Sequence, residues 1–353
     1  MSSNRSALER AAPARRSRGR AARRSWLFPG LIAALAATLV LGLGIGAVSL
    51  GPAATLRALV RPATADPTAV TIVWDLRLAR MLLAGLIGAG LASAGAGFQG
   101  LFRNPLADPF VVGASGGAAL GATLAIVFDL PWRGFGLGPV PLAALVGALG
   151  AVALVFAVAE AGGRAPRTAL LLAGAALSSL LSAAVSLLLL LNEQPLYEVF
   201  AWLMGGLSGR SWPQLRAAAP LVGLGIGGLL LLARPLDALA CGEEAAQSLG
   251  LPLGRTRAAV VAAASLTTAA TVAGAGIIGF IGLIAPHIAR LLVGAGHARL
   301  IPASALVGAI LLLVADTAAR SVAAPLEIPV GVITALLGGP FFLVLLKRHS
   351  REE

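Results

Sequence analysis

The chain has 353 residues, of which 58% are hydrophobic and only 12% are charged. A soluble domain of this length would carry about 25% charged residues, so the composition excludes an ordinary soluble protein. The net charge of +12 does not indicate nucleic-acid binding, because the positive residues gather in an N-terminal tail and in loops beside apolar stretches, as orientation signals of membrane proteins do.

Stretches of roughly 20 apolar residues recur along the sequence and predict an all-α polytopic membrane protein. Residues 1–25 hold eight arginines, and we expect them to form a disordered, basic cytoplasmic tail. Residues 26–348 are expected to form one transmembrane domain of ten helices. The predicted spans are about 26–50, 77–100, 111–128, 139–160, 168–191, 213–233, 256–275, 277–294, 301–322 and 329–347. A polar stretch over 192–211 should contain a short helix outside the membrane, over 195–204.

The arginine and lysine distribution predicts the orientation. With ten spans and the tail inside, 19 of the 27 Lys and Arg residues fall on the inner side and eight fall on the outer side. Positive residues favour the cytoplasmic side, so both termini are predicted to be cytoplasmic.

Several absences limit the chemistry that the chain can perform. The single cysteine, Cys241, excludes a disulfide framework within one chain. The three histidines, His287, His297 and His349, are too scattered to predict a metal site. A phosphate-binding GxxxxGK[ST] loop needs an internal lysine, and the only lysine is Lys347 near the C-terminus. The chain therefore has no ATPase site of its own.

Arg77 and Arg80 lie one helical turn apart at the predicted outer end of the second span. A pair of arginines snorkelling at the membrane interface is one interpretation. The other is a functional requirement for positive charge on the outer side, where arginines are normally disfavoured. Further along, Asn104-Pro105 and Asp108-Pro109 predict the end of this helix and a tight turn.

The longest polar segment among the spans is ARPLDALACGEEAAQSLGLPLGRTR, residues 233–257. It predicts two short cytoplasmic helices joined by a turn. Glu243 and Glu244 lie near the start of the second helix, where the helix dipole favours negative charge. Gly250 followed by Pro252 indicates its end. A compact charged element of this kind is expected to contact a partner.

The segment AGAGIIGFIGLIAPHIAR, residues 273–290, contains a literal GxGxxG. A dinucleotide-binding fold would need a soluble strand before it and an acidic residue about 20 positions later, and neither is present. We therefore expect a sharp turn between two spans, with Pro286 interrupting the second span. His287 could be a ligand or proton relay, but a structural role is the simpler expectation.

Asp316 and Arg320 are four residues apart and can pair on one helix face. Arg320 should lie on the outer side with Arg77 and Arg80. Ionisable residues inside spans are functional candidates by default. For Asp316 the preferred interpretation is a structural tie between helices.

Together these stretches resemble the FecCD-type permeases, the membrane subunits of binding-protein-dependent ABC importers for ferric siderophores, haem and cobalamin. The matching pieces occur in the family's order and cover nearly everything except the tail. They are RLAR (77–80), FQGLFRNPLADP (98–109), LLLAG (170–174), WLMGG (202–206), LDALACGEEAAQSLGL (236–251), GFIGLIAPHIARLL (279–292), ADTAAR (315–320) and EIPVGVITALLGGPFFLVLL (327–346).

The resemblance implies a type II ABC importer permease architecture, with ten transmembrane helices per subunit and two copies around one pathway. It implies a homodimer, two separate cytoplasmic ATPase subunits, an extracytoplasmic substrate-binding protein and a bacterial inner membrane as the location. ATP and Mg²⁺ would be bound by the ATPase partner, and this chain would bind no cofactor. Alternating access, driven by that ATPase, is the implied mechanism.

The resemblance also implies roles for residues. Arg77, Arg80 and Arg320 match outer arginines that engage glutamates of the binding protein. Residues of the segment 236–251 match coupling helices that dock on the ATPase: Leu236, Asp237, Leu239, Gly242, Glu243, Glu244, Leu249 and Gly250. Arg167 and Thr168 match a cytoplasmic gate, where the family can carry small hydroxyl residues, so Arg167 is a departure. A structural role or a place near the pathway is expected for Gln99, Asn104, Pro105, Pro286, His287 and Asp316.

For the cargo, the resemblance implies a ferric siderophore first, because the family uses it widely, then haem, then cobalamin. An ion-driven secondary transporter would need a buried acidic or histidine relay near the membrane midplane. Asp316 is the one strong candidate, and it lies toward one end of its span. An intramembrane enzyme would need a clustered catalytic constellation, and the sequence contains no HExxH.

Overall fold

The computed structural model describes residues 26–46, 48–131, 137–160, 167–192 and 194–349, and the predicted tail over 1–25 lies outside them. The regular structure of these residues is helical. The long helices are α2 (Leu27–Gly44), α5 (Ala79–Phe102), α7 (Pro139–Glu160), α8 (Arg167–Leu191), α10 (Trp212–Leu231), α13 (Leu253–Ala275), α15 (His297–Ala319) and α16 (Val330–His349). The shorter elements are α3 (Pro52–Val60), η1 (Pro62–Thr64), α4 (Pro67–Thr71), the π-helical η2 (Ile72–Leu78), α6 (Ala114–Val127), α9 (Leu196–Leu203), α11 (Ala233–Ala240), α12 (Glu243–Ser248) and α14 (Ile281–Val293).

A helix occupies each of the ten predicted spans, but two of these helices are short. Within the described residues, eight helices are long and apolar enough to cross a membrane. The other two, α6 and α14, have 14 and 13 residues. At 1.5 Å per residue they reach roughly 20 Å, less than the ~30 Å hydrocarbon core. The count of ten transmembrane helices therefore stays a prediction. The short helix expected over 195–204 is confirmed as α9.

Local backbone geometry explains why α6 and α14 are shorter than their apolar stretches. Gly113 adopts φ +85 immediately before α6. Phe280 adopts φ +69 before α14, and Gly294 adopts φ +89 after it. The first glycines of the GxGxxG stretch end α13, with Gly276 at φ +73. The expected turn between two spans is confirmed.

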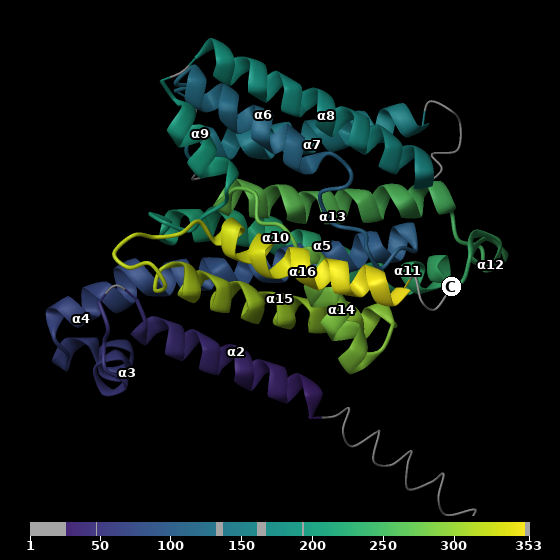
Figure 1. Ribbon diagram of the computed structural model, residues 1–353. Coiled ribbons are helices and arrows are strands. Elements are labelled where there is room, and N and C mark those ends of the chain that lie inside the picture. Colours follow the sequence, from purple (N-terminus) through teal and green to yellow (C-terminus); the bar gives the residue numbers. More distant parts are fainter. Residues whose placement is uncertain (1–25, 47, 132–136, 161–166, 193, 350–353) are drawn as a thin grey trace, which may run out of the picture.

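Helix α5 is the centre of the bundle. It packs against α10, α13, α14 and α15, while α6, α7 and α8 pack on one another and meet the rest of the bundle mainly through α13 (Figure 1). Its most apolar window is 78% buried within the chain, whereas the corresponding figures for α8 and α16 are 11% and 22%. Most of the surface of these two outer helices is thus available to lipid or to another chain.

Glycines allow the neighbours of α5 to approach its backbone. A Cβ added to Gly88 of α5 would lie 2.2 Å from the carbonyl oxygen of Gly308 on α15. One added to Gly95 would lie 1.9 Å from the carbonyl oxygen of Gly282 on α14. Small residues at helix contacts are the usual basis of packing in lipid, where burial of apolar surface gives little driving force between helices.

The two ends of the bundle carry different elements. Helices α3 and α4 lie at one end, and α11 and α12 lie at the opposite end, near the C-terminus of the chain (Figure 1). The sequence-predicted docking and coupling residues are therefore separated by the length of the bundle.

The contact between α6 and α7 provides a matched test of this packing. A Cβ at Gly147 would lie 2.2 Å from the carbonyl oxygen of Gly117, whereas one at Gly150 would meet nothing within 4 Å. We expect Gly147→Ala to cost about 1–3 kcal/mol, because overpacking against backbone forces the helices apart. Gly150→Ala, on the same helix, should leave stability unchanged or slightly raised. Thermal unfolding of the two detergent-solubilised variants checks this, and equal melting temperatures would contradict it.

Candidate functional site

The three arginines predicted for docking lie together at the end of the bundle that carries α3 and α4. Arg77 is in η2, Arg80 is in the first turn of α5, and Arg320 caps α15. Their exposed fractions are 7%, 8% and 5%. The snorkelling interpretation is therefore wrong for Arg77 and Arg80, because both side chains are covered by the chain itself.

Arg80 lies between two carboxylates. Its Nη2 is 2.9 Å from Oδ1 of Asp316, which is fully buried on α15. Its Nη1 is 2.9 Å from Oε2 of Glu327, whose side chain is 39% exposed in the loop before α16. Ser208 donates a further hydrogen bond to Glu327. Burial would raise the pKa of Glu327, but the hydrogen bond from Ser208 and the nearby Arg80 outweigh it and leave the pKa lowered.

Arg77 and Arg320 hold the C-terminal end of α2. Arg77 Nη1 donates to the carbonyl oxygen of Leu43 at 2.7 Å. Arg320 donates to the carbonyl oxygens of Gly42 at 2.6 Å and Ile45 at 2.8 Å. The last carbonyls of a helix have no partner within it, and positive charge is favourable there. The two arginines thus attach a weakly packed outer helix to the bundle.

The arginine cluster bears on two predictions: the structural tie expected for Asp316 and the docking role expected for the arginines. Asp316 pairs with Arg80 of α5 and, at 3.4 Å, with Arg320 of its own helix, so the expected tie between helices is confirmed. All three arginines have partners inside the chain. Their role in docking stays a prediction, and it requires external carboxylates to compete with partners already present.

At the opposite end, α11 and α12 form the two short helices predicted from residues 233–257. The eight residues assigned to coupling differ in burial and in the contacts that they make. Leu236 and Leu239 are fully buried and pack α11 into the core, so they cannot be direct contacts of a partner as the chain is folded here. The turns around α12 use Gly242 at φ +125 and Gly250 at φ +77.

Two charged residues of this segment are engaged inside the chain. Glu243 of α12 forms an ion pair of 2.6 Å with Arg257 of α13. Asp237 of α11 lies 2.6 Å from Nδ1 of His297. Among the eight residues assigned to coupling, Glu244, Leu249 and Gly250 are exposed, Leu249 by 74%.

The predicted gate lies at the start of α8. Thr168 is exposed in its first turn, while the side chain of Arg167 lies outside the described residues. Beyond Thr168, the exposed face of α8 carries small and hydroxyl residues at helical spacing: Ala175, Ser179, Ser182 and Ser186.

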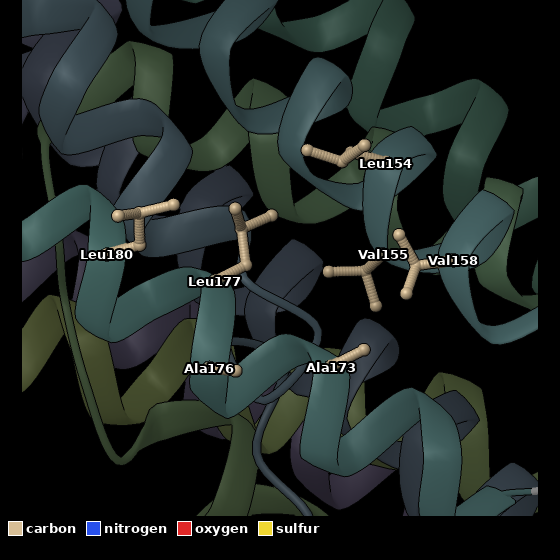
Figure 2. Close-up of a pocket in the computed structure, with 7 residues that line it drawn as sticks. All are labelled: Leu154, Val155, Val158, Ala173, Ala176, Leu177 and Leu180. Carbon is tan, nitrogen blue, oxygen red and sulfur yellow. The ribbon is translucent and has the colours of Figure 1, made fainter.

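The other side of α8 faces α7 across an apolar cavity of about 270 Å³. Figure 2 shows its lining side chains, which come from the two helices and are all leucine, valine or alanine. Such a lining offers no group to recognise a polar cargo.

The remaining expected positions lie mostly near the α11 end. Gln99 of α5 accepts a hydrogen bond of 2.8 Å from Arg290 of α14. The ring of His287 meets that of Phe341 edge-on at 5.8 Å, as a structural role would predict, and Pro286 lies inside α14.

The predicted tight turn after α5 is confirmed. The side-chain oxygen of Asn104 accepts from the N–H of Leu106, and Pro105 follows Asn104. The side chain of Asp108 accepts from the N–H of Phe110. Burial raises the pKa of Asp108 to about 6, although that backbone hydrogen bond opposes the shift.

Sequence reasoning missed three interacting residues: Glu327, Arg290 and His297. Glu327 pairs with a residue 247 positions away, and no local spacing signals such a pair. His297 pairs with Asp237, 60 positions away, and no local spacing signals that pair either.

Within the described residues, the helical bundle and its eight long apolar helices define a multi-pass membrane protein. Comparison with known proteins shows the family: the chain belongs to the FecCD transport family, whose model matches residues 34–348. This family comprises permease subunits of ABC importers.

Three relatives illustrate the breadth of the family. The chain is 48% identical to the cobalamin import system permease protein BtuC of Halobacterium salinarum, over 79% of this chain and 74% of the relative. It is 40% identical to the hemin transport system permease protein HmuU of Yersinia pestis, over 93% and 97%. It is 39% identical to the Fe(3+) dicitrate transport system permease protein FecD of Escherichia coli, over 78% and 85%.

A solved structure, described as an inward-facing conformation of a metal-chelate type ABC transporter, is also similar. It superposes with a TM-score of 0.81 at 37% identity, covering 92% of this chain and 99% of that one. The resemblance inferred from the sequence motifs is confirmed.

The buried carboxylate of the arginine cluster gives a prediction of stability. Asp316→Ala removes the shared partner of two buried arginines, and breaking such a pair typically costs about 3–5 kcal/mol. Glu327→Gln, at the half-exposed carboxylate, should cost clearly less, because glutamine keeps an oxygen acceptor and Arg80 keeps Asp316 as its charged partner. Thermal unfolding followed by tryptophan fluorescence measures both. Equal losses would show that the buried position of Asp316 has no special importance.

Asp108 gives a prediction of pH dependence. Its folded pKa of about 6 exceeds the ordinary 3.8, so the folded state keeps the proton longer and stability falls as pH rises from about 4 to 6. Asp108→Asn retains the oxygen acceptor but cannot ionise. Above pH 6 the variant should therefore be more stable than the parent, by at most about 3 kcal/mol, and the difference should vanish near pH 4. A difference that does not vary with pH would contradict this assignment.

Proposed function

We propose that the chain is the membrane-spanning permease subunit of a binding-protein-dependent importer for a metal chelate. Two copies line one pathway, with α8 of each copy facing it. A separate ATPase drives alternating access, and a binding protein delivers the cargo on the side opposite the ATPase. The proposed location is a bacterial inner membrane, with both termini in the cytoplasm.

The observation that carries this proposal is the outward face of α8. Ala175, Ser179, Ser182 and Ser186 follow one another at intervals of four, three and four residues and are exposed. This spacing puts them on one face of the helix. Small side chains permit close approach of a second helix in a membrane, and hydroxyls are poor neighbours for lipid tails. A second copy of the chain can pack closely on the small side chains, and a water-accessible pathway can solvate the hydroxyls.

The exposed face of α8 also indicates what kind of cargo the pathway suits. Its small and hydroxyl side chains provide no charge and little chemical selectivity. A pathway of this kind suits a bulky cargo that has been selected beforehand by a binding protein. The relatives named for cobalamin, hemin and ferric dicitrate all carry metal chelates.

We propose an iron chelate as the cargo, a ferric siderophore first and haem second. Cobalamin is the competing candidate, and one observation favours it: the 48% identity to the Halobacterium permease named for cobalamin import. An ion-driven transporter is disfavoured because Asp316, the expected relay residue, is held between two arginines at one end of its helix.

Coupling to the ATPase is assigned to the exposed side of the α11–α12 segment. Of the residues assigned to coupling, Glu244 and Leu249 are the exposed ones that carry a side chain. At the other end, the docking role proposed for Arg77, Arg80 and Arg320 depends on Glu327. Because this carboxylate is half exposed, an incoming glutamate can replace it beside Arg80 with the least rearrangement.

Uptake into proteoliposomes tests the transport function and the cargo. The permease is reconstituted with its ATPase and binding protein, and a labelled ferric siderophore, haem and cobalamin are compared. We expect accumulation that requires ATP and is insensitive to ionophores, with the iron chelate preferred. Preferential uptake of cobalamin would replace the iron chelate as cargo, and uptake collapsed by ionophores would overturn the ABC mechanism.

Cysteine cross-linking tests the placement of α8 at the contact between copies. In a Cys241→Ser background, which removes the only native cysteine, Ser182→Cys should form a disulfide-linked dimer on mild oxidation. Leu224→Cys on α10, 68% exposed, is the matched control and should remain monomeric on a denaturing gel. Cross-linking of the control alone would place the interface elsewhere.

A further inference from the structure

A cavity of about 460 Å³ lies at the α11 end of the bundle, where α5, α11 and α14 meet the loop before α15. It differs from the apolar cavity between α7 and α8 in that most of its lining side chains are polar. The polar lining residues are Gln99, Arg103, Asn104, His287, Arg290 and His297.

The charged side chains that line this cavity are positive. Arg103 and Arg290 contribute two permanent positive charges, and His287 and His297 contribute two imidazoles. No aspartate or glutamate is among these lining residues. A nearby carboxylate, Asp237, is bound to the Nδ1 edge of His297. A site lined in this way favours an anion and disfavours a cation.

Gln99, one of the lining residues, contains a buried amide donor. Its exposed fraction is 3%. Arginine can only donate hydrogen bonds, so the 2.8 Å bond from Arg290 Nη2 identifies the atom facing it as the amide oxygen, Oε1. The amide nitrogen therefore faces another direction, and it has no hydrogen-bond partner among the described residues. Buried donors without a partner are rare in folded proteins and call for an explanation.

His297 is the second buried group of this kind, with an exposed fraction of 4%. Asp237 fixes the ring through Nδ1 and also accepts from the backbone N–H of His297 at 2.9 Å. The opposite nitrogen, Nε2, lies over Gly100, where an added Cβ would be 2.3 Å away. It too has no hydrogen-bond partner among the described residues.

We propose that this cavity binds an anionic phosphoryl group. A phosphoryl group offers several acceptor oxygens in a tetrahedral arrangement, which matches a lining that combines arginine, amide and imidazole side chains from α5, α14 and α15. The group could belong to an anionic lipid headgroup or to free phosphate. Basic pockets between helices on the cytoplasmic side are known to bind lipid headgroups, and Leu291 and Leu292 beside Arg290 are exposed and apolar, as an acyl chain would require.

Binding to the purified full-length chain tests the proposal without any ATPase, binding protein or cargo. Failure here is therefore distinguishable from failure of the transport function. The probes are inorganic phosphate, titrated at constant ionic strength against chloride, and nanodiscs of phosphatidylglycerol compared with phosphatidylcholine. Thermal unfolding measures the binding of phosphate as a rise in melting temperature, and native mass spectrometry detects lipid that stays bound to the protein.

Arg103→Gln is the main variant, because Arg103 is exposed at the end of α5 and its loss should not impair folding. Arg290→Gln is the second, although it also breaks the bond to Gln99. Arg299→Gln, an exposed arginine that does not line the cavity, is the matched control.

We expect the occupant to bind about tenfold more weakly to Arg103→Gln and Arg290→Gln than to the parent, as loss of one charge-assisted hydrogen bond predicts. The control should bind as the parent does. A response to phosphatidylglycerol alone identifies a lipid headgroup as the source, and a response to phosphate identifies the free anion. Identical responses of the parent and all three variants, or no response of the parent to either probe, would overturn the proposal.

Discussion

The close contact of helix backbones around α5 is the constraint on which the rest of the structure depends. In lipid, apolar burial between helices provides little driving force, so packing must come from contact at short range. Glycines of α5 meet glycines of α14 and α15 with no room for a Cβ. The positions of both ends of the bundle follow from this core, because the arginine cluster is attached to one end of α5 and the basic cavity to the other.

Most of the helices could be predicted from the sequence because each is a long apolar run bounded by glycine, proline or charge. The limits of α7 and α8 agree with the prediction within one residue. The lengths of α6 and α14 could not be predicted, since positive φ angles at Gly113 and Phe280 interrupt runs that hydropathy alone would continue.

The site was less predictable than the fold, for a physical reason. Spacing on one helix correctly indicated the pair of Asp316 and Arg320, whereas the partner of Arg80 in the loop before α16 depends on tertiary packing. Similarly, the polar character of residues 233–257 indicated an exposed element, but it did not reveal that Leu236 and Leu239 anchor α11 in the core. Family resemblance identified which segments matter, and the structure separated side chains that can meet a partner from those that hold the segment.

The ion pair between Glu243 and Arg257 has a mechanical consequence. Helix α12 is fastened by this bond to the first turns of α13, and α11 is fastened to the core by its two buried leucines. Helix α13 in turn packs against α5, α7 and α10, so the ion pair connects α12 to the centre of the bundle. For the coupling role proposed above, this connection gives α12 two routes to the centre of the bundle, one through α13 and one through the buried leucines of α11.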